Sequence, residues 1–144
     1  MLSQRKGICA VVFRKRGKKT EFLLLHRVLH WKGWEFPKGG CKAGEPLEKA
    51  FFRELKEELG VSRREIVFFK RIPAMQEFDD FVRMRHHKDH SFIAELSPKA
   101  KILISKNPDV EHSSFRWLPA GKAVKLLTFE SSKRLFRKAL RFID

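Results

Sequence analysis

The pattern of apolar and polar positions predicts short strands interspersed with a few helices. Apolar, β-branched runs at residues 7–13 and 21–26 predict two strands that form a hairpin across the basic turn between them. Further strands are expected at residues 65–71, 90–96 and 100–105. Residues 72–88 mix acidic, basic and aromatic side chains, and we expect an extended strand and a mobile loop there.

Helical periodicity is clearest between Pro46 and Gly60. Proline suits the start of a helix, and glycine suits the left-handed residue just past its end. A short helix is expected from residue 119 to 127, and an amphipathic helix with a basic outer face from 131 to 142. Strands on both sides of a central helix, with another helix at the end, predict an α+β domain spanning residues 1–144. A mixed sheet would lie between helices.

Three glutamates on the central helix occupy unfavourable positions. Glu54 and Glu58 form a like-charge pair four residues apart with Glu57 between them, and such a pair costs about 0.2–0.5 kcal/mol. Glu57 and Glu58 also lie in the last turn, where the helix dipole disfavours negative charge. A hard divalent cation with oxygen ligands, Mg²⁺ above all, would turn this repulsion into attraction. The alternative is a solvated acidic face balanced by neighbouring basic residues.

The same stretch carries a longer pattern at fixed spacing. The chain fills every specified position of G-x5-E-x7-R-E-U-x-E-E-x-G-U, where U is aliphatic, with Gly39, Glu45, Arg53, Glu54, Leu55, Glu57, Glu58, Gly60 and Val61. The pattern resembles the Nudix box, and on it the chain is identified as a member of the Nudix hydrolase family. The resemblance implies an α/β/α sandwich and hydrolysis of a nucleoside diphosphate linked to another moiety.

The resemblance also suggests roles for single residues. Glu54 and Glu58 are expected to bind Mg²⁺, with Mn²⁺ as an alternative ion and the carbonyl of Gly39 as a further ligand. Glu57, also close to the metal, would orient or deprotonate the attacking water. Arg53 is expected to brace the glutamates through charge-assisted hydrogen bonds.

The identity of the general base is less well defined by this pattern. Nudix enzymes differ in which carboxylate serves, and some recruit a glutamate from a distant loop. Glu111 is the candidate of that kind in this chain.

Charge indicates a polyanionic substrate. The chain has a formal net charge of +15 at pH 7, and the stretch from Gly39 to Val61 carries −1, so the rest carries +16. Cations around a carboxylate site would attract a phosphate-rich molecule. A solubility device, or adaptation to an unusual cytoplasm, is the alternative.

Composition also bears on location. The longest apolar runs are too short to span a bilayer, and the first residues lack the apolar segment of a secretory signal. Cys9 and Cys41 form neither a disulfide framework nor a metal-binding spacing. We therefore expect a cytoplasmic protein with no membrane partner, and no feature indicates its oligomeric state.

Residues outside the box restrict the range of possible substrates. Four segments resemble the diadenosine tetraphosphate hydrolase branch of the family: residues 22–25, 34–39, 92–96 and 111–118. This resemblance implies asymmetrical cleavage of diadenosine tetraphosphate to ATP and AMP. Lys38 is expected to contact phosphate, as is Lys88 in a basic loop.

One departure from that branch concerns how the adenine base would be bound. The branch often places a Tyr in the strand matched by Ser91 and Phe92, and this chain contains no Tyr. Stacking on adenine must then come from Phe or Trp, and the candidates are Phe92, Phe81 and Trp34.

Three other functions remain open. The Trp-x-Phe-Pro-x-Gly-Gly segment at residues 34–40 also resembles hydrolases that remove pyrophosphate from the 5′ end of triphosphorylated RNA. A third activity is hydrolysis of oxidised nucleoside triphosphates. A different class is a non-catalytic RNA-binding module, against which the intact set of three glutamates argues.

Overall fold

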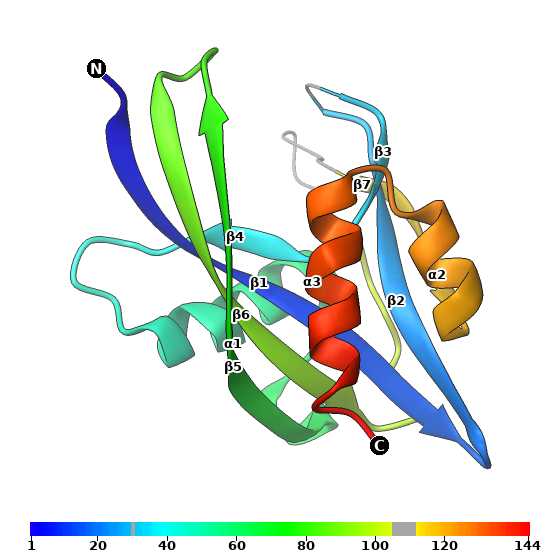
Figure 1. Ribbon diagram of the computed structural model, residues 1–144. Coiled ribbons are helices and arrows are strands. Elements are labelled where there is room, and N and C mark those ends of the chain that lie inside the picture. The colour runs from blue at the N-terminus through cyan, green and yellow to red at the C-terminus, as the bar shows by residue number, and fades with distance from the viewer. Residues whose placement is uncertain (30, 105–111) are drawn as a thin grey trace.

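The computed structural model describes residues 1–29, 31–104 and 112–144. The strands are β1 (Ser3–Arg16), β2 (Lys19–Arg27), β3 (Gly33–Glu35), β4 (Lys38–Gly40), β5 (Ile66–Asp80), β6 (Arg85–Leu96) and β7 (His112–Leu118). The helices are α1 (Leu47–Leu59), α2 (Ala120–Leu126) and α3 (Glu130–Leu140), with a 3₁₀ turn at Arg63–Glu65. Figure 1 shows α1 on one side of the sheet and α3 on the other. The predicted α+β sandwich, with a mixed sheet between helices, is confirmed.

The sheet opens between its first two strands. β1 pairs in parallel with β6 along residues 3–14, which occupies nearly all of one edge of β1. On its other edge, β1 pairs with β2 through residues 13–16 but with β4 through residues 7–9. β2 in turn pairs with β3 through residues 25–27. The β3–β4 segment therefore lies between β1 and β2 and is held by backbone hydrogen bonds on both sides.

β1 contributes to two hydrophobic cores. Its side chains alternate between the faces of the sheet, and residues 8–13 are all at most 2% exposed. Ile8, Ala10 and Val12 pack with α1, and the intervening residues pack with α3. A strand buried on both faces explains the nearly continuous apolar run in the sequence.

Helix α1 has the predicted ends. Pro46 precedes it in an extended conformation, and Gly60 follows it at φ 69°, in the left-handed region where glycine is favoured. Ala50, Phe51, Leu55 and Leu59 are buried against the sheet. Within the described ranges, no helix is both long and apolar enough to cross a membrane.

The prediction of a strand at residues 100–105 is wrong for residues 100–104, because these residues form no strand. The backbone N–H of Leu103 donates to the carbonyl of Leu59 at 2.8 Å, and Ile102 is buried in the core beneath α1. The segment thus hydrogen-bonds a carbonyl at the end of α1 instead of pairing with a strand. Its alternating pattern is compatible with either arrangement. Residue 105 lies outside the described residues.

Residues 72–88, where the sequence predicted an extended strand and a mobile loop, form most of a long hairpin. β5 continues to Asp80, and β6 begins at Arg85. The pairing of β5 with β6 is irregular between Arg71 and Met75, where Pro73 lies. A proline is tolerated there because β5 is at the end of the strand order and, among the described strands, pairs only with β6.

Candidate active site

Arg53 on α1 joins four parts of the glycine-rich stretch. Its guanidinium donates to both carboxylate oxygens of Glu45, at 2.8 and 2.9 Å, and to the carbonyl of Gly40 at 2.8 Å. It also donates to Glu54 at 2.8 Å and to Glu57 at 3.2 Å. These contacts are those expected of a residue that braces the glutamates. They tie the loop that precedes α1 to the helix itself.

Gly39 lies directly against the carboxylate of Glu54. A Cβ added at Gly39 would be 2.0 Å from the carboxyl carbon of Glu54, closer than any real contact. The absence of a side chain at residue 39 therefore lets β4 approach α1. It also brings the Gly39 backbone beside the first of the predicted metal ligands.

The three glutamates differ in exposure. The side chain of Glu54 is 9% exposed, that of Glu58 18% and that of Glu57 54%. Burial raises the pKa of Glu54 to about 7; Arg53 opposes this, while Glu58 and Glu57 add to it. A buried carboxylate that resists ionisation beside two others is a place where a cation would be stabilising.

The donors at this site fit a hard divalent ion. Carboxylate and carbonyl oxygens are the ligands that such ions prefer, and the desolvated Glu54 lies next to the Gly39 backbone. Among the described residues, no three His, Cys, Asp or Glu side chains converge as a ready ligand group. The fit therefore rests on the chemistry of the donors. Glu111, the other predicted catalytic residue, lies outside the described residues.

A cleft of about 570 Å³ brings acidic and basic side chains together. Glu54, Glu57 and Glu58 line it, and so do Gly39 and Arg53. Its cationic side chains also include Arg5, Lys38 and Lys42. The predicted combination of carboxylates and phosphate-attracting cations is thus present in one cleft.

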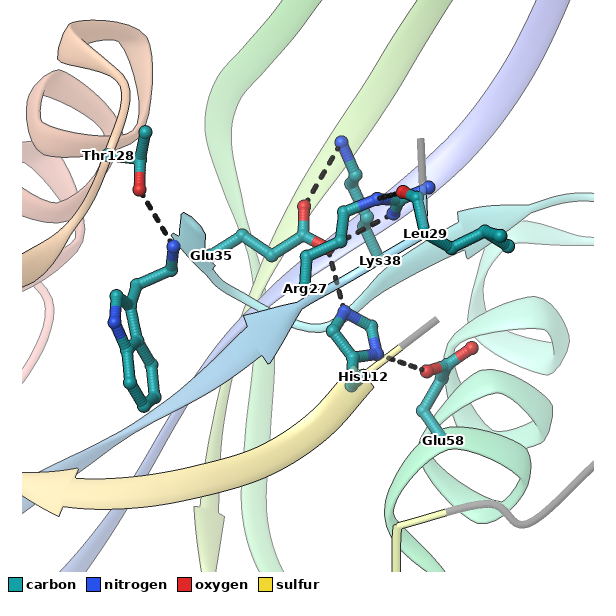
Figure 2. A network of polar contacts seen from close by, with 8 residues as sticks. Arg27, Leu29, Glu35, Lys38, Glu58, His112 and Thr128 are labelled. Atoms are coloured by element: carbon teal, nitrogen blue, oxygen red, sulfur yellow. Dashed lines mark hydrogen bonds and ion pairs between the residues drawn. The ribbon is translucent and has the colours of Figure 1, made fainter. Parts of the chain in front are cut away.

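A buried polar network extends from Glu58 into the protein (Figure 2). His112, at the start of β7, contacts Glu58 at 3.1 Å through Nδ1 and Glu35 at 2.7 Å through Nε2. Glu35 also accepts from Arg27 at 3.1 Å and lies 3.3 Å from Lys38 Nζ. The network links a predicted metal ligand to a predicted phosphate contact.

The charges in this network support each other. Burial disfavours a charged His112, but hydrogen bonds to Glu35 and Glu58 outweigh burial and raise its pKa to about 9. Burial likewise opposes ionisation of Glu35, yet His112, Lys38 and Arg27 together lower its pKa. Neither Glu35 nor His112 was among the functional residues predicted from the sequence. The only available signal was an acidic residue within the apolar Trp34–Phe36 segment, and nothing indicated its partner 77 positions later.

Of the predicted substrate contacts, Lys38 lines the cleft, whereas Lys88 and Phe92 do not. Lys88 is exposed on β6, paired in register with Lys6, and is not brought to the cleft. Phe92 is 3% exposed, and its ring stacks on Phe51 at 4.6 Å. Phe92 therefore has no free face for a base, and the predicted stacking role is corrected. Phe92 forms part of the core because its strand is covered by α1.

Replacement of Phe92 should affect stability and not substrate binding. Phe92→Ala is expected to lower the free energy of unfolding by about 3–5 kcal/mol through the cavity it leaves. The milder Phe92→Leu should leave KM unchanged in the folded protein. Urea unfolding and steady-state kinetics measure the two effects. A selective rise in KM with normal stability would restore the stacking role.

Asp89 on β6 is a second unusual carboxylate. It is 4% exposed, and burial raises its pKa to about 7; Lys38 and Arg5 oppose this, and Glu35 adds to it. Since the folded-state pKa exceeds the unfolded value of 3.8, the folded state holds the proton more tightly. Stability should therefore fall as pH rises towards and through 7.

The isosteric Asp89→Asn tests this dependence. Between pH 5 and pH 8, the natural protein should lose about 3 kcal/mol more of its unfolding free energy than the variant does. Urea titrations in EDTA at each pH provide the comparison. Parallel pH profiles for the two proteins would contradict the prediction.

Comparison with known proteins assigns the class that this fold and cleft define. The NUDIX domain model matches residues 3–140, and the chain therefore belongs to the Nudix family. It is a Nudix hydrolase that acts on phosphoanhydride bonds, and enzymes of this family generally need divalent metal cations.

Two of its relatives are named for different activities. The chain is 29% identical over 147 residues to an RNA pyrophosphohydrolase of Nitratiruptor, covering 96% of this chain and 92% of that protein. It is 28% identical over 146 residues to an asymmetrical bis(5′-nucleosyl)-tetraphosphatase of Caenorhabditis elegans, covering 96% of each. The fold also matches the crystal structure of a C. elegans Ap4A hydrolase binary complex, with a TM-score of 0.81, 24% identity and coverage of 96% and 97%.

Proposed function

We propose that this protein hydrolyses dinucleoside polyphosphates with Mg²⁺, cleaving diadenosine tetraphosphate asymmetrically to ATP and AMP. The observation that supports this most directly is the cleft of about 570 Å³, which is lined by three glutamates and by Arg5, Lys38 and Lys42. A phosphoanhydride needs both its charge neutralised and a water activated beside it. The likeness over 96% of both chains to an asymmetrical tetraphosphatase is consistent with the four-phosphate substrate.

In this proposal, Glu54, Glu58 and the Gly39 carbonyl hold Mg²⁺, and Mn²⁺ can replace it. The bound ion would neutralise phosphate charge and make the phosphorus more electrophilic. Arg53 holds Glu54 and Glu57 in position, because one of its guanidinium nitrogens donates to both carboxylates. Lys38 supplies a positive charge for a phosphate group at the same cleft.

Glu57 is proposed to take the proton from the attacking water. Its side chain is 54% exposed, so that water can reach it, while Glu54 and Glu58 are more enclosed. Glu111 is the alternative base. A strong effect of Glu57→Gln would favour the first assignment, and only a modest effect would favour the second.

Phe78 replaces Phe92 as the proposed contact for a base. Phe78 is 37% exposed, and its ring stacks parallel to that of His87 at 4.5 Å. The Nζ of Lys38 lies 4.6 Å from the centre of the Phe78 ring, which places this aromatic pair beside a residue of the cleft. Because His87 and Lys38 lie against the Phe78 ring, an adenine would contact the exposed part of this aromatic pair, close to the phosphate groups.

The second candidate is removal of pyrophosphate from triphosphorylated RNA 5′ ends. It is favoured by the net charge of +15 and by the relatives named RNA pyrophosphohydrolase. RNA binding through many phosphate contacts would weaken steeply as salt increases. Dinucleoside polyphosphates carry fewer phosphates and should show a shallower dependence.

A substrate panel with Mg²⁺ distinguishes these activities. Diadenosine tetraphosphate, nucleoside triphosphates and triphosphorylated RNA are compared at equal concentration in ¹⁸O-labelled water, with products identified by mass. ATP together with labelled AMP is the expected result. Preferential release of pyrophosphate from RNA would instead support the second candidate, and no hydrolysis of any substrate would refute the proposed function.

A further inference from the structure

Glu35 is a buried carboxylate with three cationic neighbours. It is 3% exposed and comes from β3, immediately before the turn into β4. Its Oε2 accepts from Arg27 at 3.1 Å and from His112 at 2.7 Å, and its Oε1 lies 3.3 Å from Lys38 Nζ. Both oxygens are thus engaged, by three residues from three different strands. Glu35 is therefore fixed in position by its surroundings.

His112 links Glu35 to Glu58 on α1. The residue is 2% exposed, and its two ring nitrogens face Glu35 and Glu58 from opposite sides (Figure 2). Ionised carboxylates can only accept hydrogen bonds, so both nitrogens donate. The imidazole is held at one end by a buried group and at the other holds the Oε2 of Glu58.

We propose that Glu35 is a positioning residue that orients Glu58 through His112 and orients Lys38 directly. The inference rests on the proposed function, in which Glu58 binds the metal ion and Lys38 contacts phosphate. One buried carboxylate then sets the direction of a ligand on α1 and of a cation on β4. The two side chains would otherwise be free to turn at the edge of an open cleft.

The geometry leaves the reactive groups available. His112 occupies the Oε2 of Glu58, and the side chain is still 18% exposed, so its other oxygen can face a cation. Lys38 is 26% exposed and remains at the cleft. Arg27 contributes a further positive charge, which stabilises Glu35 where burial alone would disfavour it. The arrangement resembles the way outer hydrogen bonds orient metal ligands in general.

The test measures metal affinity in the absence of substrate. Mn²⁺ and Mg²⁺ binding is followed by calorimetry for the natural protein, Glu35→Gln, His112→Gln and the double variant. Each single variant should bind the ion about 10- to 100-fold more weakly, the usual effect of removing an outer partner. The double variant should be little worse than either single variant, because both changes break one chain of contacts.

A second measurement separates the contact of Glu35 with Lys38 from its contact, through His112, with Glu58. Glu35→Gln should raise KM for diadenosine tetraphosphate more than His112→Gln does, because only Glu35 contacts Lys38. Glu21→Gln is the matched control: Glu21 is a strand residue paired with Arg14 at 2.9 Å and does not line the cleft. The control should change neither metal affinity nor KM.

Unchanged metal affinity in both single variants, with only a lower melting temperature, would overturn the inference and leave the network structural. Additive losses in the double variant would also overturn it. If Glu35→Gln does not fold, Glu35→Asp takes its place in the same measurements. A protein that binds the ion normally but hydrolyses no substrate in the panel would refute the proposed function, while the affinity comparison would still decide the role of Glu35.

Discussion

Glu57→Gln should lower kcat for diadenosine tetraphosphate by about 100- to 10,000-fold, the usual contribution of a general base. The amide has nearly the same shape as the carboxylate but cannot take a proton from water. Glu57 is the most exposed of the three glutamates and accepts a hydrogen bond from Arg53 at 3.2 Å. Stability should therefore change little, and KM should stay within a few-fold of its original value.

Glu48→Gln is the control for this change. Glu48 is exposed in the first turn of the same helix and does not line the cleft. It removes one negative charge from α1 just as Glu57→Gln does, so it corrects for the altered charge of the helix. Equal activity of the two variants would show that Glu57 has no special role in the reaction.

Gly39→Ala is expected to have a large effect for a steric reason. The new Cβ would be 2.0 Å from the carboxyl carbon of Glu54, so the carboxylate must turn away from β4. A displacement of about 1 Å at a catalytic group can cost about 100-fold in rate, and we expect at least that loss together with weaker metal binding. The loss of stability should be smaller, because the group that moves is the end of a side chain.

Gly121→Ala gives the matched comparison. A Cβ at Gly121, in α2, would meet no atom within 4 Å, and alanine favours the helix by about 0.5–1 kcal/mol. This variant should be fully active and slightly more stable. Calorimetric metal titrations and single-turnover rates measure both proteins. Normal metal affinity in Gly39→Ala would exclude the close approach of β4 to Glu54 as a requirement for the site.

The sequence was most informative where local chemistry decides the structure. Pro46 and Gly60 delimit α1 because their backbone preferences act within a few residues. The spacing of the glutamates likewise placed them beside one cleft, since one helix carries all three. Lys38 was predicted at the cleft for the same local reason, as it directly precedes the glycines of β4.

Contacts between residues far apart in the chain could not be predicted from the sequence. Phe92 is apolar and could have stacked on a base, but its burial depends on α1 packing over β6, which periodicity does not reveal. The pairing of Glu35 with His112 joins β3 to β7 and required the sheet to be known. Residues 100–104 alternate as a strand does, yet they satisfy the end of α1. These features depend on tertiary packing, which overrides local pattern.

The position of β4 between β1 and β2 has a consequence for catalysis. Ala10 donates to the carbonyl of Pro37, and Cys41 donates to the carbonyl of Lys6, so both ends of the segment that contains Lys38 and Gly39 are fastened to β1. This segment is thus already ordered when the chain folds. Substrate binding therefore does not have to supply the entropy cost of ordering it. The amide protons of this segment should therefore exchange with solvent about as slowly as those of the central strands, before any nucleotide has bound.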